Sequence, residues 1–107
     1  MTTYTIQITE QADADLRSIY SYIAIHLQAL ENAAGQLRRL EAAISALDQM
    51  PERYHRYEKE PWRTRNLRVM PVDHFVVFYI PDKDTYSVTI IRVLYGGRDI
   101  EHELNPT

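Results

Sequence analysis

Apolar residues recur through the first half of the chain at intervals of three and four, the spacing of one face of an α-helix. The first run begins after Thr9, whose hydroxyl can cap a helix, and extends to Leu27. A second run starts at Leu30 and ends before Pro51, because proline cannot continue a helix. The connection is short, so we expect an antiparallel helical hairpin. Its apolar stripes are expected to lie in the core: Ala12, Leu16, Ile19, Tyr20, Ile23, Leu27, Leu30, Ala33, Ala34, Leu37, Leu40, Ile44 and Leu47.

Residues rich in β-branched and aromatic side chains predict four strands outside the hairpin. One strand precedes the helices and three follow them: residues 4–9, 64–69, 74–80 and 86–94. A sheet with contiguous strands after a helical hairpin is typical of an α+β fold. The order β-α-α-β-β-β therefore predicts an N-terminal strand and a helical hairpin packed on a mostly antiparallel sheet.

Three further segments connect or end these elements. Residues 51–61 lack periodicity and lie between prolines, so we expect a loop. Residues 81–84 (PDKD) are expected to form a hairpin turn between the last two strands. Gly96 and Gly97 break the last strand, and residues 98–104 are expected to form a short C-terminal helix.

The length of 107 residues suits a single domain that spans residues 1–107. There is no cysteine, which excludes disulfides and thiol nucleophiles and suits a reducing cytoplasm, where we expect the protein to act. The N-terminus has no signal-peptide pattern, and no apolar run is long enough to cross a membrane. The four histidines have no metal-ligand spacing, so we expect neither a metal nor a cofactor.

The net charge is −3, but residues 53–68 carry six basic and two acidic side chains. A basic segment of this kind can meet a polyanion, while a solvated and partly self-neutralised loop is an equally good interpretation. Aromatic residues alternate with these charges, and Trp62 can either contact a base or a partner or cover the edge of the core. The candidate contact residues in this segment are Arg53, Arg56, Trp62, Arg65 and Arg68. If residues 64–69 form a strand, Arg65 and Arg68 point to opposite faces.

Several short patterns occur together along almost the whole chain. They are Thr9 with Ala12, Asp15 and Leu16; Ile44 and Leu47 before Met50-Pro51; Leu67-Arg68; Val76-Val77-Phe78-Tyr79; Ile91-Arg92-Val93-Leu94-Tyr95; and Arg98-Asp99-Ile100. In this order the chain resembles the RelE/ParE superfamily, the toxins of type II toxin–antitoxin systems. The resemblance implies a cognate antitoxin as partner and an oligomeric toxin–antitoxin complex.

The superfamily implies two activities on one fold: cleavage of mRNA on the ribosome, and inhibition of DNA gyrase through protein binding. RNA cleavage needs cations beside the phosphate and an acid or base. The resemblance implies that Arg68, Arg98 and Tyr95 would fill these roles. Arg92 and Arg98 are further candidates for target contact, although a strand arginine such as Arg92 is as able to pair with Asp99 or another acid.

Departures from the nuclease pattern favour the ParE-like side. Phe75 stands where RelE-like nucleases resemble one another in an arginine, and Glu101 and Glu103 would face an incoming phosphate. DNA gyrase is therefore the leading target and the ribosome with its mRNA the alternative. A third interpretation is an inactive member of the superfamily that serves only as a binding module.

Overall fold

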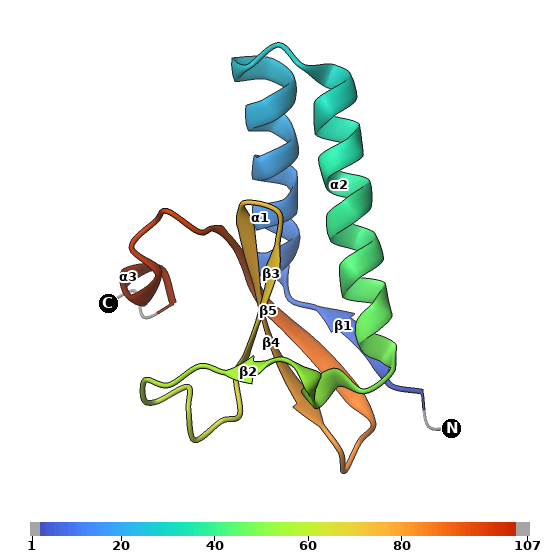
Figure 1. Ribbon diagram of the computed structural model, residues 1–107, viewed down its shortest axis with the longest axis vertical. Coiled ribbons are helices and arrows are strands. Elements are labelled where there is room, and N and C mark those ends of the chain that lie inside the picture. Colours follow the sequence, from blue (N-terminus) through green and yellow to red (C-terminus); the bar gives the residue numbers. More distant parts are fainter. Residues whose placement is uncertain (1–2, 105–107) are drawn as a thin grey trace.

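The computed structural model describes residues 3–104 as a helical hairpin standing on one face of a sheet (Figure 1). This confirms the predicted α+β fold and the short C-terminal helix. The elements in chain order are β1 (Thr5–Ile8), α1 (Glu10–Ser21), the π-helical turn η1 (Tyr22–His26), α2 (Leu30–Ser45), the 3₁₀ turns η2 (Ala46–Asp48) and η3 (Pro51–Arg53), β2 (His55–Arg56), β3 (Arg68–Val72), β4 (Phe75–Asp82), β5 (Ser87–Tyr95) and α3 (Ile100–Leu104).

Within residues 3–104 the sheet has five strands, in the order β1-β5-β4-β3-β2. β1 runs parallel to β5, with Thr5 opposite Ser87, and the other three pairings are antiparallel. A register shift between Phe78 and Tyr79 of β4 leaves one extra residue in β5, a β-bulge. The first strand of the chain is thus joined to the last.

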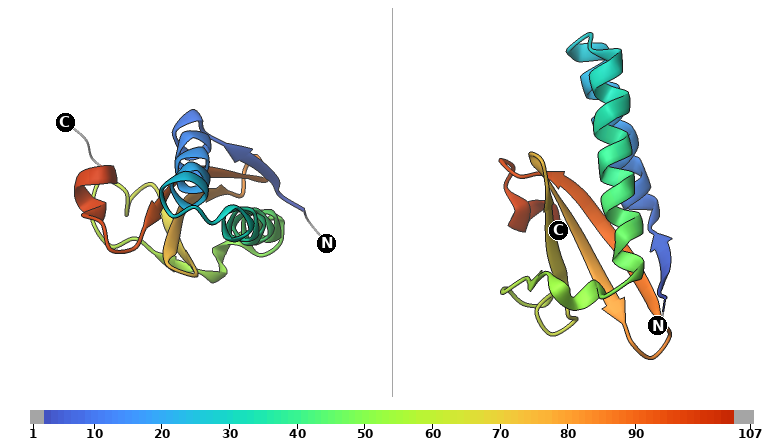
Figure 2. Two further views of the ribbon diagram at one scale, coloured as in Figure 1. Left: turned by 90° about the horizontal axis from the view of Figure 1, so that it is seen from above. Right: turned by 45° about the vertical axis from the view of Figure 1, so that its right-hand side comes forward.

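The helical hairpin covers one face of the sheet and extends beyond its end (Figure 2). The predicted cap is confirmed, since the Thr9 hydroxyl accepts the backbone N–H of Ala12 at 3.1 Å. Most of the predicted stripe is buried or half-buried, and its centre packs on β3, β4 and β5 through Leu16, Leu40 and Ile44. The prediction is wrong at the tip: Leu27 and Leu30 are 57% and 63% exposed, because the hairpin there has passed the edge of the sheet.

The opposite face of the sheet carries a second core that the sequence did not predict. Leu67, Phe78, Leu94 and Leu104 are buried there, and Trp62 and Tyr57 pack against them. The segment between β2 and β3 and the helix α3 therefore cover this face, and α3 lies on the side of the sheet away from α2 (Figure 1). Trp62 packs against this core, which agrees with the interpretation that it covers the edge of the core.

The predicted strand over residues 64–69 is wrong in its bounds, since β3 begins only at Arg68. The preceding residues form turns: the Glu60 carboxylate accepts the backbone N–H of Thr64 at 2.9 Å and its hydroxyl at 2.7 Å, and Asn66 has a left-handed φ of 66°. These local bonds compete successfully with strand pairing. Arg65 is consequently outside the strand, and the expectation that Arg65 and Arg68 point to opposite faces of it fails.

Two smaller boundaries also differ. The segment predicted as a loop, residues 51–61, contains η3 and the short strand β2. The turn predicted at residues 81–84 starts later, because Pro81 still pairs with Val88 in β4. Pro81 is tolerated there because β3 does not extend past Arg68, which lies opposite Tyr79. That strand therefore does not need the backbone N–H that proline lacks. Among residues 3–104, no helix is long and apolar enough to span a membrane.

Candidate functional site

A groove of about 970 Å³ lies between the outer half of the helical hairpin and the ends of β4 and β5. Its apolar wall comes from α1 and η1, and several of these side chains are exposed: Tyr22 is 56% exposed, Ile25 69% and Leu27 57%. The facing wall holds His74 and Phe75 at the start of β4. Exposed apolar side chains that gather around one groove are typical of a binding surface.

Two of the predicted site residues, Tyr95 and Arg98, line the end of this groove. The Tyr95 ring is half exposed and meets the Phe75 ring edge to face, with centroids 5.9 Å apart. A Cβ on Gly97 would come within 2.7 Å of that ring, so the glycine leaves room for it. The Arg98 guanidinium lies 3.3 Å from a carboxylate oxygen of Glu103, so its charge is partly balanced from within the chain.

Arg92 faces α1 rather than the groove. Its Nε and Nη2 donate to the two carboxylate oxygens of Asp15 at 2.7 and 2.9 Å, and Nη1 donates to the backbone carbonyl of Glu103 at 3.0 Å. The hydrogen bonds to Asp15 raise the pKa of Arg92, and both side chains are about one-sixth exposed. Arg92 therefore joins β5 to α1 and α3, and its acidic partners are Asp15 and, at 3.8 Å, Glu103, but not Asp99.

Arg68 is occupied in a similar way. One guanidinium nitrogen donates to the carbonyls of Glu52 and Tyr54 at 3.0 and 2.9 Å, and Nε donates to the Asn66 side chain at 3.1 Å. The side chain is 13% exposed. Arg68 thus holds the turn at η3 against the beginning of β3.

The three residues expected of a nuclease are not brought together. Arg68 pairs with Tyr79 in the middle of β4, whereas Tyr95 pairs with Phe75, the first residue of that strand. The backbones of Arg68 and Tyr95 are therefore separated by roughly 13 Å along the strands, the length of four residues. They are also about 10 Å apart across the sheet, the width of two strand spacings. Arg98 lies with Tyr95, beyond the end of β5.

A second hollow, of about 400 Å³, lies at the opposite end of the sheet from the groove. Arg56, Arg65 and Arg68 line it together, joined by Lys83 from the β4–β5 turn. The Arg65 guanidinium lies 5.2 Å from the centre of the Trp62 ring, a cation–π contact. Lys83 was missed by the sequence reasoning because only the fold brings the β4–β5 turn next to the basic segment.

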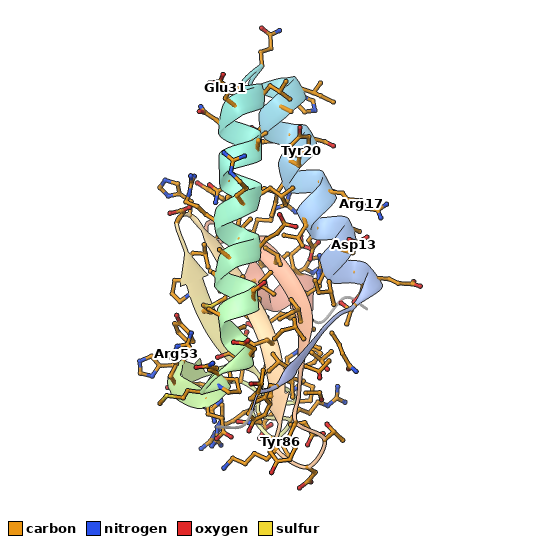
Figure 3. The ribbon with its side chains drawn as sticks, turned by 90° about the vertical axis from the view of Figure 1, so that its right-hand side faces the viewer. Asp13, Arg17, Tyr20, Glu31, Arg53 and Tyr86 are labelled. Carbon is orange, nitrogen blue, oxygen red and sulfur yellow. The ribbon has the colours of Figure 1, made fainter. Side chains whose placement is uncertain are left out.

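Arg53 differs from the other arginines because it caps a helical segment. Its Nη1 donates to the carbonyls of Gln49 and Met50 at 2.6 and 3.1 Å, and its guanidinium lies over the Tyr54 ring. Figure 3 shows Arg53 near the end of α2 that is distant from Glu31 at the hairpin tip. It remains exposed, but its position follows from the backbone groups it satisfies.

Two internal contacts fix the parts that carry these surfaces. Asp73, in the β3–β4 turn beside the groove, accepts Nε of Arg39 at 2.8 Å and the amide of Gln36 at 2.9 Å, and these bonds lower its pKa. Tyr79 is fully buried and donates its hydroxyl to the Pro51 carbonyl at 2.6 Å; burial raises its pKa to about 12.

Within residues 3–104, no group of three or more histidine, cysteine, aspartate or glutamate side chains is placed so that it could hold a metal ion.

The family model of the ParE toxin of the type II toxin–antitoxin system parDE matches residues 6–100. The chain belongs to the ParE toxin family. No curated protein sequence matches it.

Solved structures agree with the fold of this ParE-family chain. The chromosomal ParDE toxin–antitoxin system from P. aeruginosa gives a TM-score of 0.71 at 19% identity, over 87% of this chain and 96% of that one. The RelBE2 toxin–antitoxin complex of Mycobacterium tuberculosis gives 0.62 at 20% identity, over 88% and 99%. The archaeal RelE–RelB complex of Pyrococcus horikoshii gives 0.63 at 17% identity, over 91% and 99%. The family model and this shared fold together confirm the resemblance to the RelE/ParE superfamily, whereas the structures alone, at identities this low, show the fold only.

Proposed function

We propose that this ParE-family toxin stops growth by binding DNA gyrase and that a cognate antitoxin neutralises it. The observation that carries the proposal is the dispersal of the nuclease candidates. Arg68 is bonded to two backbone carbonyls, and its register partner Tyr79 lies four residues along β4 from Phe75, the partner of Tyr95. A phosphate between these groups could not be contacted by all of them, because the cations that stabilise a transition state must converge within hydrogen-bond distance.

The groove supports a protein target. Its exposed wall is apolar and aromatic, through Tyr22, Ile25 and Leu27, and protein interfaces are enriched in aromatic side chains at their core. The structural neighbours from P. aeruginosa, M. tuberculosis and P. horikoshii are toxin–antitoxin systems, which supports an antitoxin partner for this chain as well.

A supercoiling assay tests the target. Purified toxin is added to gyrase, ATP and relaxed plasmid, and we expect supercoiling to stop. Ile25→Gln should weaken the inhibition, whereas Met50→Gln should not, since Met50 is similarly exposed but does not line the groove. Full supercoiling in the presence of a large molar excess of folded toxin would exclude gyrase as the target.

The alternative, ribosome-dependent mRNA cleavage, is tested in cells that express the toxin from an inducible promoter. Primer extension on translated mRNA after induction of the toxin should show no new codon-positioned ends. Cuts that appear in the wild type and vanish in Arg98→Gln would favour the nuclease instead.

A further inference from the structure

The hollow beside Arg68 of β3 and the C-terminal end of β4 carries an excess of positive charge. Four basic and two acidic side chains line it, in a chain whose net charge is −3: Arg56, Arg65, Arg68 and Lys83 against Glu52 and Asp82. The pocket lies away from the groove to which we assign gyrase binding, so a ligand can occupy it whether or not gyrase is the target.

The two acidic side chains are already engaged. Glu52 is shared, with carboxylate oxygens 3.7 Å from Arg68 and 3.4 Å from Lys83. Asp82 accepts the backbone N–H of Asp84 at 2.9 Å and so helps to form the β4–β5 turn. Within residues 3–104, neither Arg56 nor Arg65 has a carboxylate partner.

Two of these cations directly oppose each other. Arg56 of β2 is the register partner of Arg68 of β3, and like charges at opposed positions destabilise a strand pair. Arg68 cannot turn away, because it is bonded to the carbonyls of Glu52 and Tyr54 and is 13% exposed. An anion held between the two side chains would relieve this repulsion.

The donors around the hollow suit a phosphate. Arg65 is held in place by the Trp62 ring, 5.2 Å from its guanidinium, and Lys83 is 72% exposed and can swing from Glu52 toward an added anion. Two guanidinium groups and an ammonium group from three separate segments (β2, the turns before β3 and the β4–β5 turn) supply more donors than the two oxygens of a carboxylate use, and a phosphate offers additional acceptor oxygens.

We propose that Arg56, Arg65 and Lys83 bind a backbone phosphate of a nucleic acid in this pocket, with Arg68 as a fixed positive charge beneath it. The contact is sequence-independent, because it reaches the backbone and leaves the bases unread. A pocket of about 400 Å³ accommodates one such group.

Fluorescence anisotropy with a short labelled DNA duplex of mixed sequence tests the proposal on the full chain. We expect salt-dependent binding, and an Arg56→Gln, Arg65→Gln double variant should bind about tenfold or more weakly and lower the slope of log affinity against log salt by about 1. The matched control is an Arg17→Gln, Arg38→Gln double variant, which removes the same charge from the exposed surface of the helices and should bind like the wild type. Circular dichroism checks that each variant is folded.

Two results would overturn the assignment. One is equal binding by the pocket variant and the helix variant, or no binding by the wild type at about 50 mM salt, where phosphate contacts are strongest. The other comes from calorimetry with inorganic phosphate: binding of free phosphate to the wild type without any binding of the duplex would place a small anion, not a nucleic acid, in the pocket.

Discussion

Arg92 and Asp15, which are 77 positions apart in the sequence, form a two-pronged ion pair with N···O distances of 2.7 and 2.9 Å. The same carboxylate accepts the backbone N–H of Val93 at 2.9 Å, and Arg92 also reaches the carbonyl of Glu103. One residue of β5 thus fixes the position of α1 on one side and α3 on the other. Because the helix α1 carries the groove wall, this pair sets the shape of the groove.

Breaking this pair should destabilise the protein strongly. Asp15→Ala leaves the Arg92 guanidinium with only the Glu103 contacts, and the free energy of unfolding should fall by about 2–4 kcal/mol. Urea unfolding measures the loss. Arg17→Ala breaks the pair with Asp13 at 2.9 Å, but this pair is exposed and the loss should stay below about 0.5 kcal/mol. Equal losses in the two variants would contradict a central role for Arg92.

The same substitution should destabilise the protein strongly at Arg68 and hardly at all at Arg98. Arg68→Gln removes the donor from two backbone carbonyls, and we expect a loss of about 2–4 kcal/mol in the free energy of unfolding. Arg98 is 61% exposed, so Arg98→Gln should change it by less than about 0.5 kcal/mol. Thermal and urea unfolding of both variants decide the matter, and an Arg68→Gln protein as stable as the wild type would contradict a structural role for its two carbonyl contacts.

Tyr79 should make the protein sensitive to alkali. Its folded pKa is about 12, above the value of about 10 in the unfolded chain, so its contribution is complete below pH 10 and is lost as the pH rises toward 12. The loss amounts to about 2–3 kcal/mol. Tyr79→Phe should lower the free energy of unfolding by about 1 kcal/mol at neutral pH, since the Pro51 carbonyl loses its donor. As the pH rises, the free energy of unfolding of this variant should then fall less than that of the wild type. Parallel alkaline losses in both proteins would contradict the prediction.

Asp73 should matter at acid pH. Hydrogen bonds from Arg39 and Gln36 lower its folded pKa, so its stabilising effect is present above the unfolded pKa of about 3.9 and is lost as the pH falls through the folded value. Asp73→Asn keeps the left-handed turn, because asparagine tolerates the φ of 55° found there. The stability difference between wild type and variant should therefore shrink on acidification, as measured by thermal unfolding. A difference that does not change with pH would exclude ionic contacts as its source.

The sequence predicted what depends on local periodicity. The helical hairpin and the last two strands follow from spacing alone, as does the cap at Thr9. It failed where a few side chain to backbone bonds decide the conformation, as at Glu60 and Thr64, where the expected strand is a turn. The exposed state of Leu27 was also out of reach, because periodicity does not tell where a helix passes the edge of a sheet.

For the candidate site, the sequence could predict which residues take part but not what each of them contacts. The arginines could be named from the sequence, but whether a guanidinium meets a target or a backbone carbonyl depends on contacts between distant segments. Arg68 with the Tyr54 carbonyl and Arg92 with Asp15 are examples. Arg65 and Lys83 meet in one pocket for the same reason, since the chain between them runs out along β3 and back along β4.

The parallel pairing of β1 with β5 determines when the sheet can form during synthesis. Thr5 and Ile8 are made early, while their partners Ser87 and Ile90 leave the peptidyl transferase centre only after the helices α1 and α2 and the strands β2 to β4 have been translated. At roughly 5–20 residues per second the interval is about 4–16 s. During this interval the helical hairpin has no completed sheet to pack on, so a nascent copy of this toxin lacks its groove until β5 has been translated.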